Sequence, residues 1–454
     1  MPDLAWPQIL DEATDHFRRL LQLNTTNPPG NERPAADLIA EILAQNGLDS
    51  TILESAPGRA TLVSRLKGDG SLPALLIMGH TDVVTAEPDK WDHDPFSGHM
   101  DAAGYIYGRG AVDMKQTVAA HLMAFLTIKR QFHDQGILPK RDLIFMAVAD
   151  EETGGKFGAH WMADHHPELL QDAEFALNEG GGWGVSFNGK QYMGIQAGEK
   201  GTSRFWLRAR GKPGHGSVPQ PDAGIVKLVG AVHKLGTQAM PIHLTDTMRS
   251  FFQVLIDTQP ADVAAQLQDL LATSDADRIL PGLPIDESTR REISAMLRNT
   301  AMPTILRAGQ QLNVIPDFAE AGIDGRLLPG VSREAFLAEL RTLLGPEYAD
   351  LEIVWAADLG VPLEVDFNSS LTDVIREVMA EAAPGVPLLP TLLTGGTDAK
   401  AIMPLGVKVI GFSPLPPTDS DVFNRAHAHN ERLHVDSYHF CVKNTFEIVR
   451  RFIA

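Results

Sequence analysis

The stretch DLIFMAVADEETGG, residues 142–155, is an apolar run that ends in three consecutive acidic residues and then two glycines. An apolar run this short, without polar alternation, predicts a strand that is buried on both faces. Asp150, Glu151 and Glu152 follow its carboxyl end directly. Adjacent buried carboxylates repel one another and are costly to desolvate, whereas a bound cation removes that cost. The loop is therefore either a solvated acidic turn or one wall of a cation site.

Two further apolar runs, LPALLIMGH (residues 72–80) and AEFALNE (residues 173–179), have the same character. Helical patterns separate the runs, for example TVAAHLMAFLTIKRQF at residues 117–132. After a different central region, the pattern resumes with a helix at 369–382 and a strand at 406–414. Buried strands that alternate with helices predict a catalytic α/β domain with a mostly parallel sheet.

The central region has a different pattern. TSRFWLRARG (residues 202–211) alternates apolar and polar residues, as a half-exposed antiparallel strand does. Further strands are expected in residues 319–330 and 351–359, with helical segments before and between them. The region predicts a smaller α+β domain inserted into the first. The expected boundaries are residues 1–198 plus 363–454 for the catalytic domain and 199–362 for the insertion.

Composition excludes several classes of partner. The chain has 39 basic and 58 acidic residues and a net charge of −19, so we expect neither nucleic acid nor a membrane as partner. Its one cysteine, Cys441, cannot form an intrachain disulfide and favours a reducing compartment. The start, MPDLAWPQIL, lacks a signal-peptide pattern, and no apolar run approaches the ~20 residues of a membrane span. We therefore expect a cytoplasmic protein.

Candidate metal ligands stand near the ends of these elements. His80 ends one buried run, and an imidazole nitrogen is a good zinc ligand. Asp82 is a candidate acceptor that orients the ring of His80. Asp113 lies in GRGAVDMKQ, just before a long helix, where it either bridges two cations or caps that helix. Glu179 again follows a buried strand.

The C-terminal segment HAHNERLHVD (residues 427–436) supplies a cluster of imidazoles. It contains His427, His429 and His434, and His439 follows shortly after. Taken singly, each of these histidines is better explained as a surface residue than as a metal ligand. The local pattern alone does not select one of them as a ligand.

The combination of these residues points to metal chemistry. In open α/β sheets, ligands bind outside the carboxyl ends of the strands, which gathers residues that are far apart in the chain. Two imidazoles and three carboxylates suit a hydrolase with two divalent ions. Within the acidic loop, one carboxylate can bind metal while its neighbour moves a proton. Zinc is the expected ion, and cobalt and manganese are the alternatives.

The chain resembles the zinc aminoacylase and carboxypeptidase family, which includes carboxypeptidases G and S, aminoacylase, di- and tripeptidases and succinyl-diaminopimelate desuccinylase. The resemblance spans most of the chain and implies a phosphorylase/hydrolase-like α/β/α fold for the catalytic domain. The motifs that carry it are NPPGNE, HTDVV, GRGAVDMK, DEETGG, NEGG, GKPGHGSVP, NVIPD, TGGTDAK and HAHNE.

The resemblance implies a role for each candidate ligand. Asp113 would bridge the two metals. His80 and Glu179 would complete one position, and Glu152 and His427 the other. His427 is selected because it holds the first place of the family's His-x-x-Asn-Glu pattern. By that register His429, His434 and His439 are not ligands.

Three further features of the catalytic domain are implied by the resemblance. Glu151 would be the general base and acid. Asp82 would steady His80. The peptide bond between Asp113 and Met114 would be cis.

The insertion is similar to the family's ferredoxin-like lid and dimerisation domain, so a homodimer is expected. His215 of GHGSVP would stabilise the oxyanion, often across the dimer. Asn313 and Arg326 would help to hold the substrate. The TGGTDAK segment would contribute donors from Gly395, Gly396 and Thr397. The alternatives are that Gly214 and Gly216 mark only a turn and that Asn313 lies in an ordinary loop.

Two departures from the family pattern bear on the substrate. Lys400 stands where many aminoacylase-like members have an arginine beside the substrate carboxylate, so the charge is kept but the bidentate fork is lost. Gly325 stands where a bulky residue is usual before Arg326. Both departures concern the choice of substrate and leave the metal ligands unchanged.

The implied activity is hydrolysis of an amide next to a free carboxylate, in a short peptide or an N-acyl amino acid. The long stretch at about 240–305 favours carboxypeptidase S-like and aminoacylase-like members over the shorter desuccinylases. Desuccinylase or dipeptidase activity is the alternative within the family. Outside it, the alternatives are a catalytically silent metal-binding scaffold and a phosphoester hydrolase.

Overall fold

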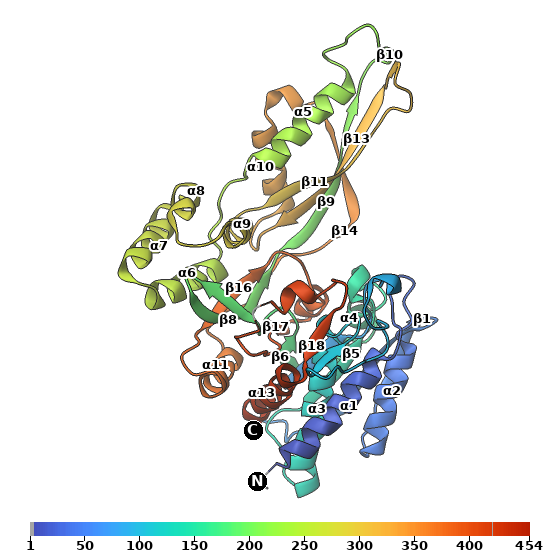
Figure 1. Ribbon diagram of the computed structural model, residues 1–454, viewed down its shortest axis with the longest axis vertical. Helices are drawn as coiled ribbons and strands as arrows, with labels where there is room; N and C mark the ends of the chain where they lie inside the picture. The colour runs from blue at the N-terminus through green and yellow to red at the C-terminus, as the bar shows by residue number, and fades with distance from the viewer. Residues whose placement is uncertain (1–3, 420) are drawn as a thin grey trace. The chain divides into compact units, whose positions relative to one another are not determined.

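The computed structural model describes residues 4–419 and 421–454 (Figure 1). The chain divides into two compact units. The first comprises Met1–Ala197, Val365–Thr391 and Thr397–Ala454, and the second comprises Gly198–Glu364 and Leu392–Gly396. The second unit begins one residue before and ends two residues after the expected insertion, and it also takes in a short later segment. The catalytic and lid roles of the two domains stay predictions.

The first unit is built on a sheet whose central strands are parallel. In spatial order these strands are β5 (Leu143–Val148), β3 (Ala74–His80), β6 (Ala173–Asn178) and β17 (Lys408–Gly411). Every residue of β3 and β5 is buried, so both faces of the sheet are covered. The predicted α/β class is therefore confirmed.

Antiparallel strands flank this parallel core, a feature that the apolar runs did not predict. On one side β2 (Arg59–Leu66) pairs with β5, and β1 (Thr51–Ala56) pairs with β2. On the other side β8 (Lys190–Glu199) pairs with β17 and with β7 (Gly184–Phe187). The strand β16 (Leu388–Leu393) also pairs with β8.

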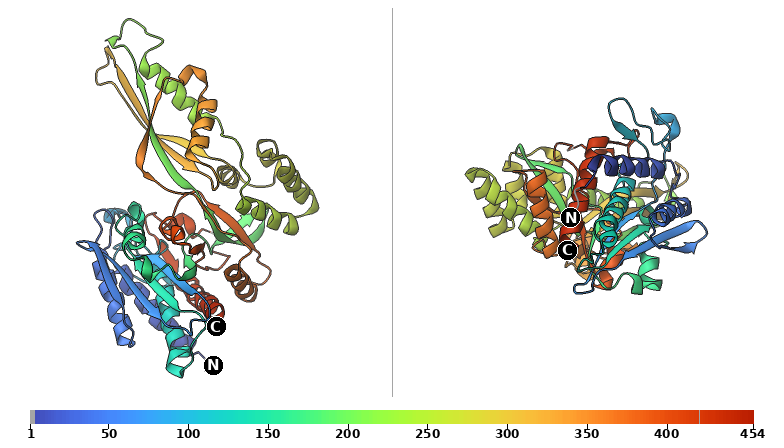
Figure 2. Two further views of the ribbon diagram at one scale, coloured as in Figure 1. Left: turned by 180° about the vertical axis from the view of Figure 1, so that it is seen from behind. Right: turned by 90° about the horizontal axis from the view of Figure 1, so that it is seen from below.

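Helices cover the sheet of the first unit (Figure 2). The helices α1 (Trp6–Leu21), α3 (Lys115–Gln131) and α13 (Val435–Ile453) pack against one another, and α3 packs on β3 and β5. Elsewhere α2 (Arg33–Gln45) packs on β1 and β2. The remaining helices of this unit are α4 (Ala159–His165), α11 (Ser370–Ala382) and α12 (Ala399–Ile402).

A small separate sheet links two distant parts of the first unit. The strand β4 (Tyr105–Tyr107) pairs antiparallel with β18 (Arg432–His434). This pairing brings the loop before α3 next to the segment before α13. Both loops carry a predicted metal ligand, Asp113 in the first and His427 in the second.

The second unit is an α+β structure around a four-stranded antiparallel sheet. The strands follow the order β11 (Thr300–Ala308), β13 (Phe318–Leu327), β9 (Gly201–Arg210) and β14 (Glu352–Leu359). Buried and partly exposed residues alternate along β9, as predicted for a half-exposed strand. The short strand β15 (Leu363–Glu364) pairs with the end of β8.

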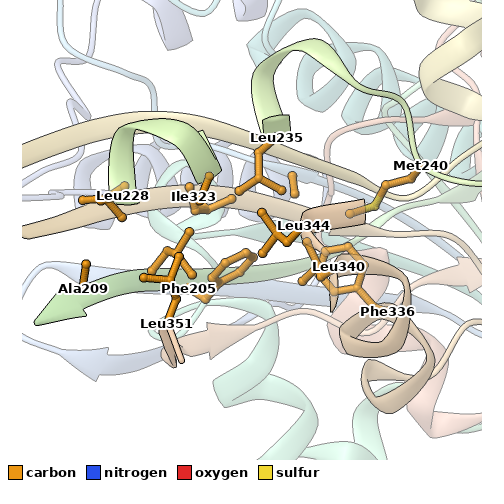
Figure 3. Packing of buried hydrophobic residues seen from close by; sticks show 14 of the residues in the cluster. Phe205, Ala209, Leu228, Leu235, Met240, Ile323, Phe336, Leu340, Leu344 and Leu351 are labelled. Carbon is orange, nitrogen blue, oxygen red and sulfur yellow. The ribbon is translucent and has the colours of Figure 1, made fainter. Parts of the chain in front are cut away.

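Two helices cover the buried face of this sheet. They are α5 (Gly224–Thr237) and α10 (Arg333–Leu344). Figure 3 shows Leu228 and Leu235 of α5 and Phe336 of α10 packed around Phe205 and Ile323 of the sheet. Burial of such a cluster supplies the main driving force for folding of this unit.

The second unit also contains a helical segment and a small two-stranded sheet. The helices are α6 (Asp246–Thr258), α7 (Ala261–Thr273), α8 (Ala276–Ile279) and α9 (Glu287–Met296). The small sheet pairs β10 (Gly214–His215) antiparallel with β12 (Val314–Ile315), two strands that α5 to α9 and β11 separate along the chain. Among the helices of the described chain, none is both long enough and apolar enough to cross a membrane.

Packing explains why a glycine stands at position 325. A Cβ atom on Gly325 would lie 2.1 Å from the backbone carbonyl oxygen of Ser203 on the neighbouring strand β9. It would also lie 3.4 Å from the ring of Phe336. A strand carbonyl cannot give way without disturbing the sheet, so a bulky residue does not fit here.

We expect Gly325→Ala to destabilise the protein by about 1–3 kcal/mol, because overpacking forces the backbone to shift. Differential scanning calorimetry would report this as a lower unfolding temperature. Gly236→Ala is the matched control, since Gly236 is in α5 and its Cβ would meet nothing within 4 Å. Alanine in a helix is favoured over glycine by about 0.5–1 kcal/mol. Equal unfolding temperatures for Gly325→Ala and the unsubstituted protein would contradict the packing explanation.

Candidate active site

Three predicted metal ligands stand at one edge of the parallel sheet in the first unit. His80 is the last residue of β3. Glu152 lies in a short 3-10 turn, Glu151–Thr153, soon after β5, and Glu179 directly follows β6. Because β5, β3 and β6 are parallel neighbours, their carboxyl ends meet, as the sequence predicted.

Asp113 places one carboxylate oxygen against each of two imidazoles. Its Oδ1 lies 3.0 Å from Nε2 of His80, and its Oδ2 lies 3.1 Å from Nε2 of His427. The position that caps α3 is Met114, so helix capping does not explain Asp113. The Asp113–Met114 peptide bond is cis, as the resemblance implied. The geometry is that of a carboxylate that can bridge two cations.

One further carboxylate accompanies each imidazole. Glu179 Oε1 lies 3.7 Å from His80 Nε2, and Glu152 Oε2 lies 3.3 Å from His427 Nε2. These distances divide the five predicted ligands into two sets that share Asp113. The sets are close to each other, since ligand atoms of His80, Asp113 and Glu152 also lie within 4.8 Å of one another.

The donor atoms fit two divalent cations. Glu152 Oε1 is buried and has no hydrogen-bond partner among residues 4–419 and 421–454, which is costly for a carboxylate oxygen unless a cation meets it. The backbone carbonyl of Asp82 lies 2.9 Å from Nδ1 of His80. A carbonyl can only accept, so Nδ1 carries the proton and Nε2 presents its lone pair to a metal. Imidazole and carboxylate donors suit zinc.

The imidazoles and Asp113 shift one another's pKa. Burial disfavours ionisation of Asp113, but hydrogen bonds from His427 and His80 outweigh it and hold its pKa below the usual range. Hydrogen bonds to Asp113 and Glu152 raise the pKa of His427 to about 10. Burial opposes protonation of His80, yet Glu179 and Asp113 raise its pKa well above the usual value. In the absence of a cation, protons bound by His80 and His427 therefore offset the negative charge of the carboxylates.

Glu151 differs in character from its neighbour Glu152. Burial and then the charge of Glu179 raise the pKa of Glu151 well above its ordinary value. Its Oε1 lies 3.9 Å from Nζ of Lys400, which is too long for a hydrogen bond. A carboxyl with a raised pKa beside a cluster of ligands suits proton transfer.

Asp82 does more than the sequence predicted. Its carboxylate is 3.5 Å from Nδ1 of His80, so it lies beside the ring, as expected. Its two oxygens accept hydrogen bonds from the backbone N–H groups of Glu151 and Glu152, each at 3.1 Å. Asp82 therefore also fixes the loop that carries the predicted base and a predicted ligand.

A buried network behind this loop was missed by the sequence reasoning. The Asn27 amide donates to Asp82 at 2.8 Å and to Asp150 at 3.0 Å. The Arg59 guanidinium donates to Asp150 at 2.7 Å and donates to both carboxylate oxygens of Glu32, each at 2.8 Å. The available signal was the NPPGNE motif, which contains Asn27 and Glu32 and to which no role was assigned.

Asp398 is a second missed residue. It is 1% exposed, and burial is the main cause that raises its pKa to about 8. Its charge contributes to the raised pKa of Glu151. The signal was its place between Thr397 and Lys400 in the TGGTDAK segment.

The residues predicted to hold the substrate fall in both units. Thr397 and Lys400 belong to the first unit, whereas Gly395 and Gly396 end the short segment assigned to the second. The Thr397 hydroxyl accepts the N–H of Ala399 at 3.1 Å. The structure brings Lys400 to Glu151, as described above.

Within the second unit, the pairing of β10 with β12 brings His215 and Asn313 together. The N–H of Gly216 donates to the carbonyl of Asn313 at 2.8 Å. The N–H of Ser217 donates to Nδ1 of His215 at 3.2 Å, so the neutral ring carries its proton on Nε2. The exposed ring can therefore donate a hydrogen bond from Nε2, which a residue that stabilises an oxyanion must do.

Arg326 is not brought to the β10–β12 pair in the same chain. It lies near one end of β13, while Phe318 at the other end pairs with Arg210 of β9. Eight residues of strand at about 3.4 Å per residue separate Arg326 from Phe318 by roughly 27 Å. The Arg326 guanidinium instead binds Asp324, at 2.7 and 3.2 Å.

Two of the three histidines that the family register excluded, His434 and His439, have other contacts. His434 caps α13 by accepting the N–H of Asp436 at 3.2 Å. His439 lies 2.9 Å from the hydroxyl of Thr14. These contacts give both rings a structural role.

Comparison with known proteins places the chain in a family. The model of peptidase family M20/M25/M40 matches residues 76–451. The probable carboxypeptidase S-like 2 of Dictyostelium discoideum is 30% identical over 403 residues, which cover 85% of this chain and 74% of that protein. Aminoacylase-1 of Mus musculus is 26% identical over 441 residues, which cover 93% and 90%.

Solved structures share the fold. The M20 family metallo-carboxypeptidase Sso-CP2 from Sulfolobus solfataricus matches with a TM-score of 0.70 at 19% identity, covering 98% of this chain and 99% of that chain. Since the family model spans most of the sequence, the chain belongs to peptidase family M20/M25/M40 and is a metal-dependent hydrolase.

Proposed function

We propose that this protein is a dinuclear metal-dependent amide hydrolase that cleaves a short peptide or an N-acyl amino acid next to a free carboxylate. The observation that carries the proposal is the position of Asp113, with one oxygen against His80 and the other against His427. His80 and Glu179 would complete one metal position, and Glu152 and His427 the other. Zinc fits these donors, and cobalt or manganese would also be accepted.

The reaction follows from the groups around that site. Two bound cations would polarise the scissile carbonyl and acidify a water. Glu151 would take the proton of the attacking water as the carbon–oxygen bond forms. The same carboxyl would then give that proton to the leaving amine as the carbon–nitrogen bond breaks. Nε2–H of His215 would donate to the oxygen that becomes negative.

The substrate carboxylate would be held by cationic and polar side chains. Lys400 and Arg326 are the proposed cations, and Asn313 and Thr397 are the proposed neutral donors. Gly395 and Gly396 would add backbone N–H groups. The names of the two relatives, a carboxypeptidase and an aminoacylase, support this choice of substrates. A desuccinylase or dipeptidase activity is the alternative.

A homodimer would resolve the separation of the substrate-binding groups. In one chain, roughly 27 Å of strand parts Arg326 from the end of the sheet nearest His215, which is more than a dipeptide spans. A second copy could bring its β10–β12 pair, with His215, to the substrate. The edge strand β11 exposes Met302, Ile305 and Leu306, and such an apolar edge is suited to pairing with another chain.

A cytoplasmic location is also proposed. The one cysteine, Cys441, is buried and free. A chain without disulfides is suited to a reducing compartment.

Substitutions at the neighbouring residues Glu151 and Glu152 should separate catalysis from metal binding. Glu151→Gln should keep two metal ions and lower kcat by about 100- to 10,000-fold, because a general base is lost. Glu152→Gln should weaken binding of one ion, because a ligand is lost. Metal content by mass spectrometry and hydrolysis of a panel of N-acyl amino acids and dipeptides would measure both effects. Near-normal turnover by Glu151→Gln would rule out its role as base.

Metal uptake should release protons. In the metal-free protein the pKa of His427 is about 10, so its ring is protonated at neutral pH, and a cation binds only the deprotonated ring. The apparent affinity for Zn²⁺ should therefore rise with pH, by about tenfold per unit for each proton released. Titration calorimetry between pH 6 and 7.5, in buffers of different ionisation enthalpy, would count those protons. A pH-independent affinity would contradict this expectation.

Mixing two inactive variants should test whether His215 acts across a dimer. In a hybrid of Glu151→Gln and His215→Ala subunits, one site would keep Glu151 and receive an intact His215 from its partner. Random exchange of equal amounts should restore about a quarter of the wild-type activity, since half of the dimers are hybrids with one active site each. Analytical ultracentrifugation would confirm the dimer. If His215 acted within its own chain, mixing would restore nothing.

A further inference from the structure

A buried ion pair joins the two loops that carry Asp113 and His427. Arg109 precedes Asp113 by four residues, and Glu431 follows His427 by four. Nη1 of Arg109 lies 2.6 Å from Oε2 of Glu431, and the two residues are 2% and 0% exposed. The strands β4 and β18 pair immediately next to these residues and hold the two loops together.

Glu431 holds the backbone of the predicted bridging ligand. Its Oε1 accepts the N–H of Val112 at 2.7 Å and the N–H of Asp113 at 3.1 Å. Both oxygens of Glu431 are thus occupied by protein donors, one by Arg109 and the other by this backbone. Glu431 is therefore not itself a metal ligand.

Arg109 holds the backbone of the second loop. Nη1 donates to the carbonyl of Ala428 at 3.2 Å, and Nη2 donates to the carbonyl of His427 at 3.3 Å. His427 has a φ of 61°, a left-handed conformation that is unfavourable for most residues other than glycine. The guanidinium also lies over the ring of Trp91, with Cζ 5.2 Å from its centroid. An ion pair, two hydrogen bonds to carbonyl groups and the contact with this ring therefore fix the orientation of the Arg109 guanidinium.

We propose that Arg109 and Glu431 form a positioning clamp that sets the spacing of Asp113 and His427 and so determines the affinity of the metal position these two residues share with Glu152. The inference rests on the proposed function, since it presumes that those side chains bind metal. Metal ligands must be placed within a few tenths of an ångström, and groups that orient ligands typically contribute 10- to 100-fold in affinity. The clamp acts on both ligands through their backbones.

A purely structural role is the competing explanation, because breaking a buried ion pair destabilises any protein. Arg141 offers a matched control in the same unit. It is also buried, forms an ion pair with Glu174 at 2.9 Å and lies over the ring of Phe452. It stands just before β5, at the opposite end of that strand from the acidic loop.

The experiment titrates the metal-free full-length protein with Zn²⁺ by calorimetry, and with Co²⁺ by visible absorption, at fixed pH. The unsubstituted protein should bind two ions. Glu431→Gln and Arg109→Met should bind one ion as before and the other about 10- to 100-fold more weakly, with an altered Co²⁺ spectrum. Arg141→Met should lower the unfolding temperature and leave both affinities unchanged.

Two further variants separate charge and stability from positioning. Arg109→Lys keeps the positive charge but has one nitrogen, which cannot span Glu431 and the His427 carbonyl, so the weaker site should remain weak. The double variant with Arg109→Met and Glu431→Met leaves no unpaired buried charge and should regain stability over the single variants. Its metal affinity should stay low. If the single variants do not fold, the metal affinity of the double variant still tests the proposal.

The outcomes distinguish the clamp from the proposed function. Failure of the unsubstituted protein to bind two ions would overturn the proposed dinuclear site. Two ions bound by that protein, with unchanged affinities in Glu431→Gln or in the double variant, would overturn the clamp alone. An equal loss of affinity in Arg141→Met would also overturn it, because the effect would then follow stability.

Discussion

The contact on which the site depends is that of one carboxylate with two imidazoles. Each oxygen of Asp113 faces Nε2 of a different histidine, one at the end of β3 and one near the C-terminus. A carboxylate is planar and short, so a single side chain sets the distance between the two nitrogen atoms. This requirement is met only if the loops before α3 and α13 keep fixed positions relative to each other. The pairing of β4 with β18 and the Arg109–Glu431 ion pair hold them there.

Placing so many acidic side chains close together is unfavourable unless other groups stabilise them. A chain of hydrogen bonds and ion pairs behind the site provides this stabilisation. Asp82 accepts backbone N–H groups from the acidic loop, and Asn27 joins it to Asp150. Arg59 then pairs Asp150 with Glu32. Buried charges are tolerated when they are paired and hydrogen-bonded in this way. The same bonds hold Asp150 at a φ of 71°, so the strained turn and the charge balance have one origin.

The sequence predicted the parts of this design that depend on local pattern. Apolar runs revealed β3, β5 and β6, and the parallel arrangement then brought His80, Glu152 and Glu179 to one edge. The choice of His427 among several histidines came from a motif, because nothing local distinguishes it. The pairs Arg59–Glu32 and Arg109–Glu431 were missed. Their partners are far apart in sequence, and charged residues look solvent-exposed until tertiary structure buries them together.

Under the proposed function, a lysine instead of an arginine at position 400 changes which residues orient the substrate carboxylate. Lys400 contacts Glu151 at 3.9 Å, which is a Coulombic contact without a hydrogen bond. A lysine attracts a carboxylate as a point charge and does not fix its orientation as an arginine fork does. Orientation of the carboxylate must then come from directional donors elsewhere, and the proposed ones are the Arg326 guanidinium and the Asn313 amide. Both residues belong to the second unit, Arg326 to the strand β13 and Asn313 to the segment just before β12. Selectivity in this chain should therefore depend more on these donors of the second unit than on the cation beside the base.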